Sequence, residues 1–332
     1  MRATLEVFDR ASDDAHETLE RSYELAGDTV RVRYAGTRLA DRFDVPLAPF
    51  ATEDPAAPAL TISCWDRTTV DRSPPPPPWS HTDHLPRHRI RGFDADGVRA
   101  TYDVQHGLLH LYDPESRQAV CFAQDAARIP PWTARAPFRA LLGWWATDRG
   151  LAVVHASAVG GPHGCVLVTG PSGSGKSTTA LACVARGFGL VADDVAIVAL
   201  GAEVAAFASS GIAKVEAGSP VGLDELGGTV VEVHGAQTML DLGGRVVRRA
   251  PVRAVIAASV GADARCRVER LAPANCFRAL AGHSVVEALS GDQRSLPALR
   301  ELARRVPAYR IELGSDLDDV VATVCAVLER SA

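Results

Sequence analysis

One stretch of the sequence, residues 165–187, restricts the fold more than any other. It opens with the short apolar run CVLVT, continues through the glycine-rich segment GPSGSGKS at 170–177, and passes into a helix-forming segment that Gly187 ends. The glycine-rich segment matches the spacing G-x-x-x-x-G-K-[ST], in which glycines allow consecutive backbone N–H groups to surround an anion. A strand, a glycine loop and a helix in this order predict an α/β domain with a phosphate site at the helix N-terminus.

The scarcity of lysine supports this match. Of the 35 Lys and Arg residues, only Lys176 and Lys214 are lysine. Where arginine serves as the general surface cation, a position that keeps lysine is a candidate for needing a compact ammonium group. Lys176 belongs to the glycine loop and is expected to reach the terminal phosphates of a nucleotide, and Lys214 is a further candidate by the same reasoning. The loop residues expected to bind these phosphates are Gly170, Ser172, Gly173, Ser174, Gly175, Lys176, Ser177 and Thr178.

Two adjacent carboxylates follow the loop closely. The strand predicted at 188–192 ends on Asp193 and Asp194. Neighbouring strands lie about 4.8 Å apart, so carboxylates on a strand one or two places from the loop reach the phosphate site. One carboxylate can then lie near Mg²⁺, together with the Ser177 hydroxyl, while the other acts as a base toward an acceptor hydroxyl. The alternative is a solvent-exposed Asp-Asp turn.

His155 lies in the middle of the apolar strand predicted at 151–159. A lone histidine in such a run is often a hydrogen-bonded core residue. This strand leads by a short turn into the strand that precedes the glycine loop, so His155 is also a candidate for a place beside the phosphates. The residues alone leave both interpretations open.

Composition argues against several classes of protein. The formal charge of −5 argues against general nucleic-acid binding, and no run of about 18 apolar residues predicts a membrane span. The first residues carry acidic side chains and lack the apolar core of a secretion signal. The seven cysteines include no Cys-x-x-Cys pair, as is typical of free thiols in a reducing compartment. We therefore expect a cytoplasmic protein that binds neither nucleic acid nor membrane.

The length of 332 residues predicts two domains. Residues 1–130 are typical of a β-rich α+β domain, in which Pro74–Pro78 form a polyproline II segment expected to be an exposed loop or hinge. Residues 131–332 are expected to form the second domain.

The sequence also predicts secondary-structure elements beyond those named above. They are strands at 29–34, 98–104, 108–112, 118–124, 229–233, 252–259 and 309–313, helices at 134–148 and 295–305, and a last helix capped by Ser315.

Four blocks of residues resemble the HPr kinase/phosphorylase superfamily, in particular its shorter relatives in peptide-modification clusters. The blocks are HASAV at 155–159, the glycine loop at 170–178, GFGLVADD at 187–194 and SSGIAK at 209–214. The resemblance covers about residues 140–332. It implies an α/β P-loop kinase domain of the HPr kinase/phosphoenolpyruvate carboxykinase-like type.

The same resemblance assigns roles to individual residues. It implies that Asp193 is the base that takes the proton of an acceptor serine, that Asp194 helps to hold Mg²⁺, and that His155 lies beside the phosphates. The block around Lys214 looks like a lysine-containing segment of the peptide-cluster relatives, including the proposed kinases of lasso-peptide precursors. The chain departs from the family at Thr178, where HPr kinases usually carry glutamate. The later loop that HPr enzymes use for dephosphorylation is not found in the sequence, and the first half does not resemble their regulatory domain. The resemblance therefore leaves open whether phosphorolysis occurs and whether HPr is a substrate.

Together these features predict an ATP- and Mg²⁺-dependent kinase that phosphorylates a hydroxyl, expected to be a serine, on a peptide or protein such as a ribosomal-peptide precursor. The first domain is expected to recognise that acceptor. Two alternatives stay open: a kinase of small-molecule hydroxyls that uses the same site, and a nucleotide-sensing regulatory protein without an acceptor. The sequence also leaves open whether several copies assemble into a homo-oligomer.

Overall fold

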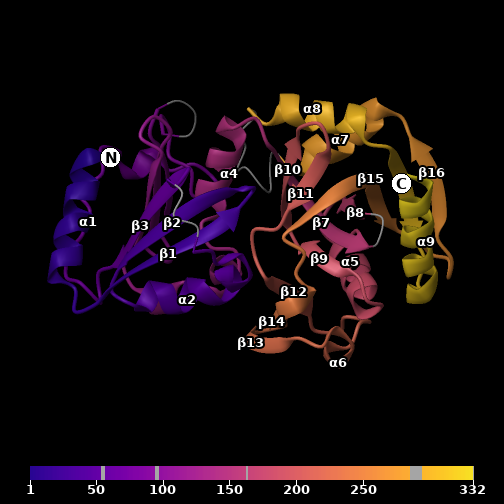
Figure 1. The fold of residues 1–332 in the computed structure, drawn as a ribbon, viewed down its shortest axis with the longest axis horizontal. Helices are drawn as coiled ribbons and strands as arrows, with labels where there is room; N and C mark the ends of the chain where they lie inside the picture. The colour runs from indigo at the N-terminus through magenta and orange to yellow at the C-terminus, as the bar shows by residue number, and fades with distance from the viewer. Residues whose placement is uncertain (54–56, 94–96, 162–163, 285–293, 332) are drawn as a thin grey trace. The chain divides into compact units, whose positions relative to one another are not determined.

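The computed structural model shows a mixed α/β chain with several sheets (Figure 1). It describes residues 1–53, 57–93, 97–161, 164–284 and 294–331. The chain forms two compact units, Met1–Asp148 and Arg149–Ala332. The division therefore falls later than the boundary after residue 130 that the sequence predicts. No helix within the described ranges is both long enough and apolar enough to cross a membrane.

The first unit contains a six-stranded sheet in the order β1-β2-β3-β6-β5-β4. Its strands are β1 (Thr18–Leu25), β2 (Asp28–Ala35), β3 (Leu60–Asp66), β4 (Arg99–Asp103), β5 (Leu108–Asp113) and β6 (Gln118–Ala123). β3 runs parallel to both β2 and β6, and the other pairs are antiparallel. The meander of β4, β5 and β6 lies where the alternating pattern predicts it. β1 and β3 were not predicted from the sequence.

Helices and short 3-10 turns cover this sheet. They are α1 (Arg2–Asp14), α2 (Arg38–Leu47), η1 (Ala48–Phe50), η2 (His81–Asp83), η3 (Ala126–Arg128), α3 (Pro131–Ala134) and α4 (Arg139–Asp148). Phe8 of α1 packs against Trp65 at 5.8 Å between ring centroids. The helix predicted at 134–148 is confirmed over residues 139–148 as α4. Its predicted start is wrong, because Ala134 ends α3, Pro137 interrupts the helix and Phe138 adopts φ +61° before α4 begins.

The second unit is built on an eight-stranded sheet in the order β11-β10-β7-β8-β15-β17-β16, with β9 beside β7. Its strands are β7 (Ala152–Gly161), β8 (Gly164–Thr169), β9 (Gly189–Ala192), β10 (Val195–Leu200), β11 (Val204–Phe207), β15 (Arg249–Val260), β16 (Arg267–Leu271) and β17 (Ala308–Leu313). The first residues of β15 pair with β11 and the later ones with β8, so the sheet curls back on itself. β8 lies between antiparallel β7 and parallel β15.

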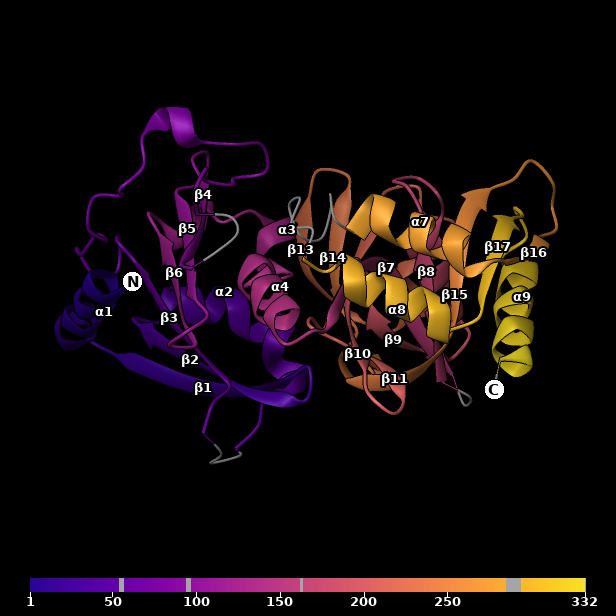
Figure 2. The ribbon, with the colours of Figure 1, turned by 90° about the horizontal axis from the view of Figure 1, so that it is seen from above.

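Helices cover both faces of this sheet, and Figure 2 shows α7 and α8 lying across β7, β8 and β15. The helices are α5 (Lys176–Ala185), α7 (Pro273–His283), α8 (Leu296–Arg305) and α9 (Leu317–Arg330). Val166 and Val168 of β8 join the core under α5 and α9, whereas Cys165 and Leu167 join the core under α7 and α8. A strand covered on both faces is apolar throughout, which accounts for the run CVLVT.

A small sheet in the order β12-β14-β13 completes the second unit. Its elements are β12 (Ile212–Glu216), α6 (Leu223–Leu226), β13 (Thr229–His234), β14 (Gln237–Asp241) and η4 (Gly243–Arg245). Of these, only β13 was predicted from the sequence. The cap predicted for the last helix is also corrected: Asp316, not Ser315, is the N-cap of α9, and its side chain accepts hydrogen bonds from the N–H groups of Asp318 and Asp319.

Candidate active site

The glycine loop joins the end of β8 to the start of α5. Gly170, Gly173 and Gly175 have φ values of +151°, +78° and +90°, a region that residues with a side chain rarely adopt. A Cβ at Gly170 would lie 2.6 Å from Oγ of Ser174 and 2.7 Å from the carbonyl oxygen of Ala258. Gly170 and Gly175 are therefore required by both backbone angle and space, and Gly173 by backbone angle alone.

Polar groups of this loop converge where an anion would bind. Lys176 is buried, and its Nζ donates hydrogen bonds to the carbonyl oxygens of Gly170 at 2.8 Å and Pro171 at 3.0 Å. Oγ of Ser174 is buried and has no hydrogen-bond partner among the residues that the structure describes. A buried hydroxyl normally has a partner, so the loop fits a ligand with phosphate oxygens. The other predicted loop residues lie beside these, with Ser172 exposed and Ser177 and Thr178 half-buried.

The sheet brings the two carboxylates to the same edge as the loop. β7 pairs with β10 through residues 152–155 and with β9 through residues 158–160, so Asp193 and Asp194 bridge the two strands. The N–H of Ala156 donates to the carbonyl oxygen of Asp194 at 3.1 Å, and Ala156 is opposite Thr169, the last residue of β8. Asp194, Ala156 and Thr169 therefore form one row across three strands, and the glycine loop begins at the next residue.

Asp193 is held by two elements. Its Oδ2 accepts a hydrogen bond of 3.0 Å from the backbone N–H of Lys214 on β12. Its carbonyl oxygen accepts a hydrogen bond of 2.6 Å from Oγ of Ser157 on β7. Lys214 thus reaches Asp193 through its main chain, while its ammonium group pairs with Glu216 at 2.8 Å.

His155 lies between the loop strand and the carboxylates. Its Nδ1 is 3.3 Å from Oδ1 of Asp194. Its backbone is fixed on both sides, because its N–H donates to Oγ of Ser284 at 3.0 Å and its carbonyl oxygen accepts from Oγ1 of Thr169 at 3.1 Å. His155 is therefore buried, as a core histidine would be, and also directed at the acidic pair.

Three buried hydroxyl groups hold the backbone of Asp193 and His155 in place. The sequence analysis did not single out the residues that carry them. Ser157, Thr169 and Ser284 each have an exposed fraction of 0 % and each hydrogen-bonds to the backbone of Asp193 or His155. A small polar residue inside an apolar strand is the signal that could have marked Ser157 and Thr169. Ser284 lies 129 residues from His155, and no local pattern indicates that contact.

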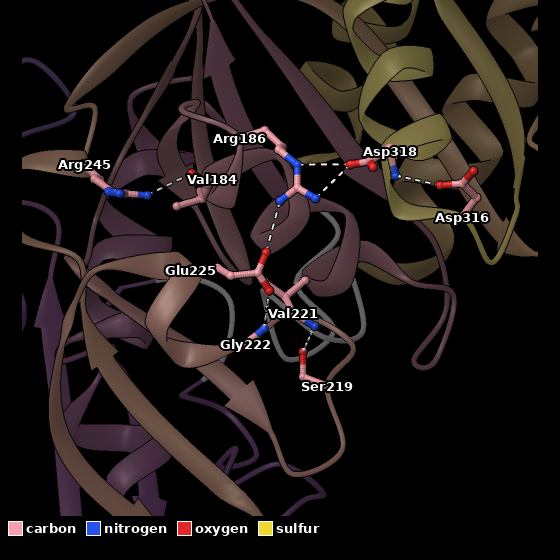
Figure 3. Close-up of polar contacts among 9 residues, drawn as sticks. All are labelled: Val184, Arg186, Ser219, Val221, Gly222, Glu225, Arg245, Asp316 and Asp318. Carbon is pink, nitrogen blue, oxygen red and sulfur yellow. Dashed lines mark hydrogen bonds and ion pairs between the residues drawn. The ribbon is translucent and has the colours of Figure 1, made fainter.

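The far end of α5 is anchored to three other elements (Figure 3). Arg186 donates to Oδ1 of Asp318 at 2.8 Å and to Oε2 of Glu225 at 3.1 Å. The N–H of Gly222 and the guanidinium of Arg186 both lower the pKa of Glu225. Arg245 donates to the carbonyl oxygen of Val184 at 3.0 Å and so satisfies one of the last carbonyl groups of α5. The helix that starts at the loop is thus held at its other end by α9, α6 and η4.

The donor set at the loop suits Mg²⁺. No group of three or more His, Cys, Asp or Glu side chains in the described part of the chain could hold a metal ion. Mg²⁺ is commonly held by one or two carboxylates, phosphate oxygens and water rather than by a complete protein cage. The Asp194 carboxylate and the Ser177 hydroxyl offer the oxygen ligands that such a site uses.

Comparison with known proteins finds distant structural neighbours among solved structures. No protein-family model and no curated protein matches the chain. Among solved structures, the HPr(Ser) kinase/phosphatase from Coxiella burnetii is similar at 15 % sequence identity and a TM-score of 0.28. The match covers 54 % of this chain and 98 % of that one.

Proposed function

We propose that this protein is an ATP- and Mg²⁺-dependent kinase that transfers the γ-phosphate to a serine hydroxyl of a peptide or protein, such as a ribosomal-peptide precursor. One observation carries the proposal. A glycine loop with a buried lysine and a pair of adjacent carboxylates meet at one edge of one sheet, with His155 between them, 3.3 Å from Asp194. An anion site beside a carboxylate base is what transfer of a phosphoryl group to a hydroxyl requires.

Each residue has a role in this proposal. The loop N–H groups, Ser174 and Lys176 hold the phosphates of ATP. Ser177 and Asp194 hold Mg²⁺, which when bound neutralises charge on the phosphate oxygens. His155 orients the Asp194 carboxylate. Asp193, fixed by the N–H of Lys214, takes the proton of the acceptor hydroxyl.

The transfer step then balances in atoms and charge. Asp193 accepts the hydroxyl proton as the hydroxyl oxygen forms a bond to the γ-phosphorus. The bond between that phosphorus and the oxygen bridging the β- and γ-phosphates breaks, which leaves ADP and a phosphorylated acceptor. Lys176, whose ammonium group lies within the glycine loop, and the loop N–H groups stabilise the charge that develops on the leaving phosphate.

Replacement of Asp193 by asparagine tests the base. Loss of general-base catalysis costs about 100- to 10,000-fold in rate, so we expect at least a 100-fold fall in labelled phosphate transferred from ATP, with Mg²⁺-dependent ATP affinity kept within threefold. Asp224→Asn, at an exposed position on α6, is the matched control and should transfer phosphate normally. Transfer by Asp193→Asn at the wild-type rate would contradict the base assignment. Absence of Mg²⁺-dependent ATP binding to the wild-type protein would overturn the whole proposal.

The acceptor is tested with two pools. Labelled ATP is incubated with the protein and either a peptide pool or a metabolite pool. Phosphorylated serine in the peptide pool supports the proposal. Label only in the metabolite pool favours a small-molecule kinase that uses the same site. ATP binding with slow turnover and no phosphorylated product in either pool favours a nucleotide sensor.

A further inference from the structure

The first unit contains a pocket of about 350 Å³ that the proposed kinase reaction does not use. The five-proline run Pro74–Pro78 forms one wall of it, and Trp79 continues that wall. Ala3 and Thr4 of α1 border the pocket on another side, and Leu109 and Leu111 of β5 lie among its lining residues. The proline run therefore lines a pocket large enough for a ligand and is not only an exposed loop.

The walls of this pocket are held in place without a ligand. Prolines fix φ and lack an N–H, so a run of five is stiff. The chain before the run is anchored by Arg72, whose carbonyl oxygen accepts from Nε1 of Trp65 at 3.0 Å and whose Nε donates to Asp14 of α1 at 2.7 Å. After the run, the N–H of Ser80 donates to Oδ2 of Asp83 at 2.9 Å. The Arg72 contacts hold the start of the wall, and the ring contact of Trp79 with Phe93 holds its end. A wall held in this way gives a preformed pocket, which lowers the ordering cost of binding.

The chemistry of the lining restricts the ligand. Among the residues that the structure describes, no side chain lining the pocket carries a charge, and the polar groups come from Thr4, Ser73, Gln124, Tyr102, Trp79 and the N-terminal amino group of Met1. A cation placed there would lose its hydration without meeting a negative charge. Four aromatic rings also line the pocket, from Trp79, Phe93, Tyr102 and Phe122.

The aromatic walls favour a ring over an aliphatic chain. The rings of Trp79 and Phe93 already meet edge to face, with centroids 5.2 Å apart and planes at 64°. Such pairs contribute beyond the area that they bury, and a bound ring would extend the arrangement. Ligand pockets in proteins usually have volumes of about 300 to 1,000 Å³, so this pocket suits a ligand group at the small end of that range.

We infer that this pocket binds an aromatic group of about the size of an indole ring that carries no positive charge. The group can belong to a free small molecule or to a tryptophan side chain of a peptide, since both present the same ring. This inference does not depend on the proposed kinase function, because each residue named for it lies in the first unit.

The test is a titration of the full-length protein with indole and, separately, with the capped peptide acetyl-Gly-Trp-Gly-amide. Calorimetry gives the affinity, and the methyl NMR signals of Val98, Leu109 and Leu111 locate the probe. We expect saturable binding of indole with a Kd of about 1 mM or tighter. Tighter binding of the peptide than of indole assigns the pocket to a side chain, and binding of indole alone assigns it to a small molecule.

A substitution that fills the pocket with a large side chain, and the same substitution outside the pocket, provide a matched pair of variants. Ala3→Trp places a large ring at the rim, and Glu6→Trp places the same ring on the exposed part of the same helix, outside the lining. We expect Ala3→Trp to weaken indole binding at least tenfold and Glu6→Trp to leave it unchanged. Val98→Phe, on a different segment of the lining, is a second filling variant that keeps the test independent of α1. Thermal unfolding establishes that each variant folds.

Three results would overturn the inference. The first is no saturation with indole by about 10 mM. The second is indole binding that both filling variants leave unchanged. The third is binding of the permanently cationic ring N-methylquinolinium as tightly as indole, which would contradict a ligand without positive charge.

Discussion

The backbone N–H of Lys214 donates a hydrogen bond of 3.0 Å to Oδ2 of Asp193, while the Lys214 ammonium group pairs with Glu216 at 2.8 Å. The small sheet therefore meets the acidic pair through its main chain. Any residue except proline could supply that N–H. The rarity of lysine drew attention to Lys214, but the group of Lys214 that contacts Asp193 is one that every non-proline residue carries.

This relationship predicts a selective effect of Lys214→Ala. The variant keeps the N–H that holds Asp193, so we expect the pH profile of kcat to stay as in the wild-type protein. The lost ion pair is partly exposed, and such pairs contribute about 0 to 1 kcal/mol to stability. Glu216→Gln breaks the same pair and is the matched control for stability. A shifted pH profile in Lys214→Ala, but not in Glu216→Gln, would show that the ammonium group acts on the base.

Ser157→Ala should lower both stability and transfer. The change removes the 2.6 Å hydrogen bond to the carbonyl oxygen of Asp193 in a fully buried place, and an unsatisfied buried group costs about 1 to 3 kcal/mol. Asp193 would also lose part of its support, so we expect kcat to fall while the KM for ATP changes little.

Ser63→Ala on β3 is the control for that prediction. Ser63 is equally buried, but its Oγ has no hydrogen-bond partner among the described residues. Removing an unpaired buried hydroxyl should change stability by less than about 0.5 kcal/mol or increase it. All five tryptophans lie before residue 149, so tryptophan fluorescence reports the unit of Ser63, and circular dichroism reports both units. Equal losses in the two variants would contradict the importance of the Ser157 bond.

Gly170→Ala should abolish tight nucleotide binding. The new Cβ would lie within 2.7 Å of both Ser174 Oγ and the carbonyl oxygen of Ala258, at a φ of +151°. We expect Mg²⁺-dependent ATP affinity to fall more than tenfold by calorimetry. Gly282→Ala in α7 is the control, because its Cβ meets no atom within 4 Å and alanine stabilises a helix by about 0.5 to 1 kcal/mol relative to glycine. Unchanged ATP affinity in Gly170→Ala would place the phosphates elsewhere.

Asp103 should make the first unit sensitive to acid. Burial opposes its charge, but the side chain of His106 at 2.7 Å, nearby His88 and the backbone N–H of His106 outweigh it, so the pKa of Asp103 lies below its usual 3.8. A lowered folded-state pKa contributes stability that is complete above the unfolded-state pKa and is lost as the pH falls through the folded-state pKa.

The measurement for this prediction is chemical denaturation followed by tryptophan fluorescence between about pH 5 and pH 3. The difference in unfolding free energy between the wild-type protein and Asp103→Asn should shrink as the pH falls through this range. A difference that stays constant, or that grows toward pH 3, would contradict the role assigned to the Asp103 carboxylate.

Thiol labelling should separate two cysteines from the other five. All seven are free, and Cys266 and Cys325 are the two that are not fully buried. Burial raises the pKa of Cys165 and of Cys183 to about 12, which suppresses the reactive thiolate. We expect at most two thiols to react quickly with an alkylating reagent in the native protein, and all seven after denaturation. Rapid reaction of a third thiol would contradict the burial of the other five cysteines.

Much of the second unit follows from the sequence because the rules that form it act over short distances. Apolar runs predict β7, β8 and β9, and the glycine loop needs backbone angles that glycine alone adopts readily. The order strand, loop, helix, strand then places Asp193 and Asp194 at a strand end. The apolar pattern mispredicted a helix start where a single residue interrupts it, as Pro137 does between α3 and α4.

By itself the sequence determined the glycine loop, the lysine that starts α5 and the acidic pair after β9. Only the tertiary structure decided that Asp194 lies in one row with Thr169, that β12 supplies an N–H to Asp193, and that Ser284 holds His155 from 129 residues away. The physical reason is that these contacts depend on strand order, register and packing between distant segments. Backbone propensity and hydrophobic periodicity restrict each segment, but they do not specify which segments become neighbours.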